Sequence, residues 1–138
     1  MEEQLLKLIP FKIAVRLLLI LSCLALIFHI LVLVRIIPFS IVWGGRISSV
    51  SEMQRFEITS LFINGLLLFV VMKKGGLISL NLPSSLTQTI LWFYVISFIF
   101  NTLGNLFAKA DLESLIFTPL TIVSAILCYR IVREKQLL

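Results

Sequence analysis

The sequence predicts an all-α membrane protein that folds as an antiparallel bundle of four transmembrane helices. The first reason is composition: 59% of the 138 residues are hydrophobic and only 14% are charged, whereas a soluble domain is about half apolar and about a quarter charged. The second reason is the presence of four apolar runs of about 20 residues, long enough to cross a hydrocarbon core roughly 30 Å thick. Such a chain has no room for another folded unit, so we predict one integral membrane domain over residues 1–138.

The four predicted spans cover residues 13–35, 52–72, 86–108 and 112–131. Ser51 and Gln54 have the spacing of a capping box at the start of the second span, and Ser85 and Gln88 repeat that spacing before the third. Residues 1–12 begin acidic and no small-residue cleavage site follows the first span, so we expect no cleavable signal peptide.

The start of the fourth span carries two further signals. Asp111 is a suitable N-cap. Pro119 lies near the second turn, where its missing N–H predicts a mild kink or a loosened first turn. The connections are short, with a tight turn predicted at residues 109–111, and short connections favour antiparallel neighbours.

Lysine and arginine residues favour one orientation in the membrane. If both termini lie on the same side, eight of the twelve basic residues lie there: Lys7, Lys12, Arg16, Lys73, Lys74, Arg130, Arg133 and Lys135. The other four lie opposite: Arg35, Arg46, Arg55 and Lys109. Because basic residues concentrate on the cytoplasmic side, we predict a multi-pass protein of the cell membrane with both termini in the cytoplasm. The first and third loops then face outward.

The cysteines and the net charge argue against several kinds of site. Cys23 and Cys128 both lie inside predicted spans and form no C-x-x-C pair, so we expect packing residues rather than a redox or zinc site. The net charge of +5 comes from basic residues that flank the spans, and it therefore indicates topology rather than nucleic-acid binding. The sequence predicts no cofactor.

Polar residues within the spans gather in the outward half of the membrane. His29, Glu57, Asn64, Asn101 and Asn105 all map there. Polar groups in hydrocarbon are costly and usually functional, so we predict a polar pocket that binds a ligand. The alternative for each asparagine is a hydrogen bond between helices, worth about 0.6 to 2 kcal/mol. The alternative for Glu57 is an ion pair with an arginine of the same end, Arg55 or Arg46.

The first loop contains the segment Trp43-Gly44-Gly45-Arg46, which we predict to cover this pocket. Glycine permits positive φ angles and close backbone approach. Tryptophan favours the membrane interface, and the arginine fork can bind an anion such as a lipid phosphate. The alternative is a tight turn with an aromatic anchor, in which Arg46 pairs with Glu52 or Glu57.

Three stretches together carry a family resemblance. They are the Trp43–Arg46 segment, Phe56-Glu57, and the end of the third span from Asn101 to Lys109, Asn-Thr-Leu-Gly-Asn-Leu-Phe-Ala-Lys. With them the chain resembles, over most of its length, uncharacterised small bacterial proteins with four transmembrane helices. This resemblance implies the same fold and no activity.

The sequence leaves three functions open. The first is a membrane protein whose outward pocket binds, or helps to transport, a small molecule or an anionic lipid headgroup. The second is a structural or accessory subunit whose polar residues specify helix packing. The third is a membrane-embedded enzyme that uses His29 and Glu57 as acid and base on a lipid-like substrate; no nucleophile or metal motif supports it. The expected partners are membrane lipids, and either a second copy of the chain or a larger membrane protein.

Overall fold

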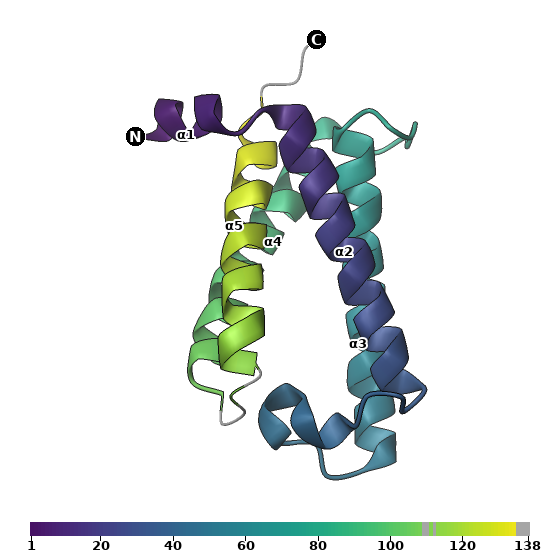
Figure 1. The fold of residues 1–138 in the computed structure, drawn as a ribbon. Coiled ribbons are helices and arrows are strands. Elements are labelled where there is room, and N and C mark those ends of the chain that lie inside the picture. Colours follow the sequence, from purple (N-terminus) through teal and green to yellow (C-terminus); the bar gives the residue numbers. More distant parts are fainter. Residues whose placement is uncertain (109–110, 112, 135–138) are drawn as a thin grey trace.

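The protein is built from four long helices (Figure 1). The computed structural model describes residues 1–108, 111 and 113–134. The long helices are α2 (Phe11–Leu33), α3 (Val50–Lys74), α4 (Ser84–Leu106) and a fourth that consists of a π-helical turn, η3 (Glu113–Phe117), followed by α5 (Thr118–Val132). Each of the four is long and apolar enough to cross a membrane. The predicted antiparallel four-helix membrane bundle is thereby confirmed.

Three short helices complete the described chain. They are α1 (Glu2–Leu8) and two 3-10 turns in the first loop, η1 (Phe39–Ile41) and η2 (Trp43–Gly45). The start of α1 and the end of α5 lie at the same end of the bundle, which we call the terminus end; the 3-10 turns lie at the opposite end, the loop end (Figure 1). Hydropathy gave no signal for α1, because this short helix is half polar.

The α3 helix begins earlier than predicted, and its cap is a different serine. Ser49, not Ser51, is the N-cap: its hydroxyl accepts a hydrogen bond of 3.2 Å from the backbone N–H of Glu52. The Glu52 carboxylate in turn accepts 3.0 Å hydrogen bonds from the backbone N–H and the hydroxyl of Ser48. Ser49 therefore caps the helix, while the Glu52 carboxylate, a stronger acceptor than the amide of Gln54, reaches back to Ser48, the residue before the cap, instead of closing a capping box with Ser49.

The start of α4 also differs from the prediction. Pro83 is the N-cap and makes no side-chain capping bond. Gln88 does not act as a cap; its amide donates a 2.7 Å hydrogen bond to the carbonyl oxygen of Val132, at the end of α5. Both α2 and α4 begin directly after a proline, Pro10 or Pro83, because proline suits the first turn. The hydropathy pattern marked where the apolar run begins, which is slightly later.

The start of the fourth helix is loosened, as predicted from Pro119. The backbone winds as a π-helix over Glu113–Phe117 and becomes α-helical at Thr118. Proline removes one backbone donor and crowds the preceding turn, and this favours wider winding there. Of the turn predicted at residues 109–111, only Asp111 lies among the described residues, so its proposed capping role stays a prediction.

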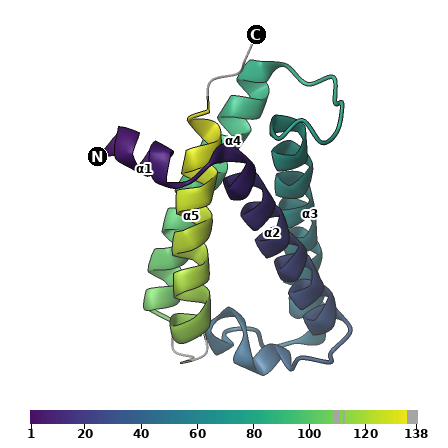
Figure 2. The same ribbon diagram turned by 45° about the horizontal axis from the view of Figure 1, so that its top comes forward.

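The helices form two pairs, α2 with α3 and α4 with α5, which are joined at the terminus end. Figures 1 and 2 show the pairs close together at that end and diverging toward the loop end. The main core lies at the terminus end and in the middle, and takes buried residues from all four helices: Ala14, Val15, Leu18, Leu67, Val70, Val71, Leu91, Tyr94, Val95, Leu127, Cys128, Ile131 and Val132. A smaller cluster of Val32, Val42, Ile47 and Met53 fixes the first loop on α2 and α3.

A buried arginine ties the start of the chain to its last helix at the terminus end. The Nε of Arg130 donates a 2.7 Å hydrogen bond to the carbonyl oxygen of Ile9, and its Nη1 lies 2.8 Å from the carboxylate of Glu134. Its guanidinium also lies over the Phe11 ring, 5.9 Å from the centroid. Arg130 thus holds the junction between α1 and α2 against α5.

Close packing of α2 on α3 depends on Gly75. A Cβ atom at this position would lie 2.8 Å from Cγ1 of Val15 and 3.2 Å from the carbonyl oxygen of Val71. Valine is stiff about χ1, so it cannot swing away without cost. We expect Gly75→Ala to lower the free energy of unfolding by about 1 to 3 kcal/mol, as measured by denaturant titration in detergent micelles.

Two further variants test that explanation. In Val15→Ala the obstructing methyl groups are gone, so adding Gly75→Ala to it should cost clearly less than adding it to the natural chain. Gly104→Ala is the matched control, because a Cβ there has no neighbour within 4 Å. A helical Gly→Ala change in open space should be neutral or stabilising by up to about 1 kcal/mol. Equal losses at both glycines would contradict the packing argument.

Candidate functional site at the loop end

The face of α3 that points into the bundle changes from apolar to polar along its length. Glu57, Ser60, Asn64, Leu67 and Val71 alternate in steps of three and four residues and therefore share one helix face. Leu67 and Val71 belong to the main core, whereas the other three lie toward the loop end. We call such a row an interior stripe.

The interior stripes of α2 and α4 change in the same direction. On α2 the stripe runs from buried Leu18 through Ser22 to His29. On α4 the stripe continues from the buried pair Leu91 and Tyr94 to half-buried Asn105; Asn101 has the same helical spacing, but its side chain is exposed. The predicted gathering of His29, Glu57, Asn64, Asn101 and Asn105 in one half of the bundle therefore agrees with the fold.

Three of the predicted site residues meet at Glu57. Its side chain is 0% exposed. One carboxylate oxygen, Oε2, lies 2.6 Å from Nδ1 of His29, and the other, Oε1, accepts a 2.7 Å hydrogen bond from the indole N–H of Trp43. The three side chains come from α3, α2 and the first loop. This network explains how a carboxylate can be buried, since both oxygens have a donor.

The network determines which nitrogen of His29 faces a partner. Because Nδ1 lies against a carboxylate, it carries the hydrogen, and a neutral His29 then offers the Nε2 lone pair as an acceptor. Nε2 makes no hydrogen bond to any residue that the structure describes. The His29 side chain is 16% exposed. His29 is therefore an oriented ring with one free polar atom.

Arg46 lies outside this network. It is exposed and makes no ion pair within the described part of the chain. The alternative pairings of Glu57 with Arg55 or Arg46, and of Arg46 with Glu52, are wrong, because His29 and Trp43 occupy both Glu57 oxygens and Ser48 binds Glu52. Arg55 instead donates from Nε to the carbonyl oxygen of Ser51 at 3.4 Å.

The asparagines do not join the helices to one another. Asn64 donates a 2.9 Å hydrogen bond to the carbonyl oxygen of Ser60, in its own helix. The side chains of Asn101 and Asn105 have no hydrogen-bond partner among the residues that the structure describes. The contact between α4 and α3 at mid-depth is made instead by Tyr94, whose hydroxyl donates to the carbonyl oxygen of Ile63 at 2.7 Å. Hydrogen bonding between helices therefore does not explain why the three asparagines lie in these spans.

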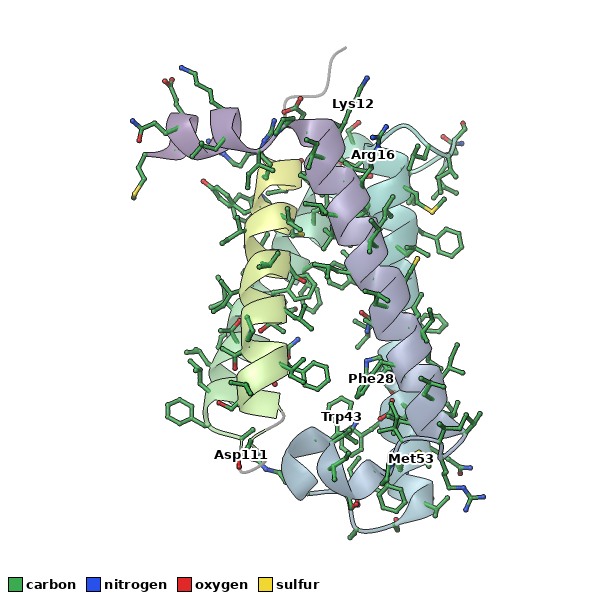
Figure 3. The ribbon with its side chains drawn as sticks, viewed as in Figure 1. Lys12, Arg16, Phe28, Trp43, Met53 and Asp111 are labelled. Carbon is green, nitrogen blue, oxygen red and sulfur yellow. The ribbon has the colours of Figure 1, made fainter. Side chains whose placement is uncertain are left out.

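Aromatic rings surround the network, and the sequence assigned none of the phenylalanines a role in the site. The Phe28 ring packs edge-on against His29 at 5.6 Å and against Phe117 at 5.1 Å, which links α2 to the start of α5. The Phe56 ring lies 5.1 Å from Trp43. Figure 3 places Phe28 and Trp43 near each other at the loop end. One phenylalanine among eleven in apolar runs gives no sequence signal for such a role.

Two open pockets lie away from these residues, one along the start of the fourth helix and one between α4, α5 and the start of the chain. One of about 490 Å³ is lined by Asp111, Ser114, Leu115, Thr118, Pro119 and Ile122. The other, of about 530 Å³, is lined by Met1, Glu2, Val95, Ile99, Thr102, Leu103, Ile122, Ala125, Ile126 and Tyr129. Neither contains a predicted site residue. The mostly apolar lining of the second pocket suits acyl chains of the surrounding bilayer.

No protein-family model matches this chain, and no curated protein or solved structure matches it either. The resemblance to small bacterial four-helix membrane proteins therefore stays a prediction. The membrane-bundle fold rests on the four helices themselves.

Proposed function

We propose that the protein binds a small hydrogen-bonding molecule, or the polar headgroup of a lipid, at the loop end, and that this end faces the outside of the cell. The observation that carries the proposal is Asn105. Its amide is half-buried and lies on the same interior stripe as Leu91 and Tyr94. It has no hydrogen-bond partner in the described chain.

An unpartnered amide in this position needs an explanation. Polar groups within a membrane bundle usually bind one another, because hydrocarbon offers them no partner. Asn101, one turn away, also has no hydrogen-bond partner among the described residues, although its side chain is exposed, and Nε2 of His29 is likewise unpartnered there. Three polar groups on two helices therefore point to a ligand, or to water that a ligand displaces.

The chemistry of these groups favours an uncharged ligand. An amide offers both donors and acceptors, and a ring nitrogen of His29 adds a further polar contact. Within the described interior stripes at this end there is no lysine or arginine, and Arg46 is exposed. This charge pattern suits hydroxyl- or amide-bearing molecules better than the anion that the sequence suggested.

The outward orientation rests on the basic residues. The terminus end carries most of the lysines and arginines, and such residues concentrate on the cytoplasmic side. The main core closes the bundle at that end with apolar side chains from all four helices. A single bundle therefore suits binding from one side, and help in transport would require an oligomer or a larger partner.

The proposal predicts opposite effects on binding and on stability. Asn101→Leu combined with Asn105→Leu should reduce the amount of any co-purifying small molecule or lipid by at least about tenfold, equivalent to roughly 1.4 kcal/mol. The free energy of unfolding should stay unchanged or rise, because these amides make no bond within the described protein. Mass spectrometry of extracts from protein purified in mild detergent, together with denaturant titration, measures both.

Asn81→Leu is the matched control, since it makes the same change in an exposed loop at the terminus end. It should leave the bound molecule in place. If the double variant is destabilised and keeps its bound molecule, or if the natural protein binds none, the asparagines serve packing. The function as an accessory subunit would then be preferred.

One observation favours that second function. Both oxygens of Glu57 are satisfied inside the protein, by donors that tie the first loop to α2 and α3. This part of the site stabilises structure whether or not a ligand binds. An enzyme has less support: His29 and Glu57 lie within hydrogen-bond distance, but no nucleophile lies in the network and no metal-binding cluster occurs within the described residues.

A further inference from the structure

Access to His29 is limited by two aromatic rings that differ in how firmly they are held. Phe28 belongs to α2 and packs against both His29 and Phe117. Trp43 lies in the first loop, 6.4 Å from the His29 ring, and is 37% exposed. A change that uncovers His29 is therefore easier on the side of Trp43.

The backbone around Trp43 adopts a costly conformation. Trp43 has a φ of 55°, in the left-handed region that is unfavourable for a large side chain, and Gly44 and Gly45 follow with φ of 68° and 69°. The buried residues Val42 and Ile47 anchor the chain on either side. A strained conformation persists only where neighbouring contacts compensate for it.

The Trp43 side chain has two compensating contacts, the Phe56 ring at 5.1 Å and a hydrogen bond to Glu57, and the hydrogen bond is the directional one. The indole N–H donates to Oε1 at 2.7 Å, and the acceptor belongs to a fully buried carboxylate. A hydrogen bond to an ionised acceptor is stronger than one between neutral groups. It holds the ring against the network, and losing it would let the strained backbone relax.

We propose that Trp43 is a gate residue: its indole ring covers His29 and is latched in place by the hydrogen bond to Glu57. Opening the latch moves the ring into the solvent, while Val42 and Ile47 keep the rest of the loop in place. The gate controls entry to the binding site of the proposed function, so its biological role rests on that function. The latch itself can be tested without any ligand.

His29 is the single histidine of the chain, which makes its accessibility directly measurable. Diethyl pyrocarbonate forms a bond between its carbonyl carbon and a neutral imidazole nitrogen and releases ethanol and carbon dioxide. Trp43→Phe keeps an aromatic ring but removes the donor. We expect the full-length variant in detergent micelles to be modified at His29 about tenfold faster than the natural protein, equivalent to roughly 1.4 kcal/mol. Peptide mass spectrometry locates the product.

Trp92→Phe is the matched control, because Trp92 is the other tryptophan and packs on Tyr129, away from the network. It should leave the rate unchanged. Trp43→Ala should be at least as fast as Trp43→Phe. If Trp43→Phe reacts like the natural protein and only Trp43→Ala reacts faster, the ring shields His29 without a latch and the proposal is overturned.

Two readouts separate access from other causes. Greater access raises the rate at every pH and leaves the midpoint of the pH–rate profile in place, whereas altered basicity of His29 moves the midpoint. A moved midpoint with an unchanged plateau rate would overturn the gate. Hydrogen exchange should rise in residues 43–46 of Trp43→Phe and stay unchanged in α4, which also verifies that the variant is folded. If Trp43→Phe speeds the modification of His29 but the natural protein carries no bound molecule, the gate stands and only the proposed function is refuted.

Discussion

Replacing Glu57 with alanine should lower the free energy of unfolding by about 2 to 4 kcal/mol, since hydrogen bonds to a charged group contribute about 1.5 to 3 kcal/mol each. The change removes the acceptor of both His29 and Trp43. It also leaves a space in a position that is 0% exposed. Denaturant titration in micelles measures the loss, and hydrogen exchange should show the first loop opening before the helices do.

Double-mutant cycles assign this loss to its two partners. Glu57→Ala and His29→Ala should cost less together than the sum of the single changes, and the same should hold for Glu57→Ala with Trp43→Phe. Glu57→Gln should have a smaller effect, because the amide keeps the size and an acceptor oxygen. Additive losses in both cycles would show that Glu57 acts through packing alone.

Replacing Arg130 with methionine should lower the free energy of unfolding by about 2 to 4 kcal/mol, because it removes charged hydrogen bonds made by a side chain that is only 8% exposed. The carbonyl oxygen of Ile9 and the carboxylate of Glu134 both lose their donor. Methionine retains much of the apolar stem that packs there. The junction of α1 and α2 should also detach, which limited proteolysis near Lys7 would detect.

Arg133→Met is the matched control for this prediction. Arg133 forms its ion pair with Glu2, and both side chains are largely exposed, so its loss should cost at most about 1 kcal/mol. If the two arginine variants lose equal stability, the buried contacts of Arg130 are no stronger than a surface pair. Arg130→Lys should fall between them, since a lysine cannot donate to both acceptors with the geometry of a guanidinium.

The four helices could be predicted because the membrane imposes a simple rule on sequence. Each span must be apolar over about 20 residues and satisfy its own backbone, so hydropathy locates it. The predicted positions of the helix ends were less accurate, because helix ends depend on local hydrogen bonds rather than on hydropathy. The choice of Ser49 over Ser51 as the cap of α3 illustrates this.

The depth of the site could be predicted, but its contacts could not. Helical spacing placed Glu57 and Asn64 on one face, and counting from the helix ends placed His29 at the same level. That Trp43 rather than Arg46 reaches Glu57 depends on backbone angles within the loop. Likewise, the hydrogen bond of 2.9 Å that Thr121 accepts from Thr102, which joins α5 to α4, depends on contacts between helices.

The contact between Arg130 and Ile9 also has a consequence for biosynthesis. It joins residues 121 positions apart in the chain. The α2–α3 hairpin can enter the membrane and pack while the ribosome is still translating the remainder, because its contacts are local in sequence. The junction of α1 and α2, however, can bind Arg130 only after α5 has emerged from the ribosome. We therefore expect the nascent chain to persist as an incomplete bundle until synthesis is nearly finished, with the junction of α1 and α2 among the last parts to settle.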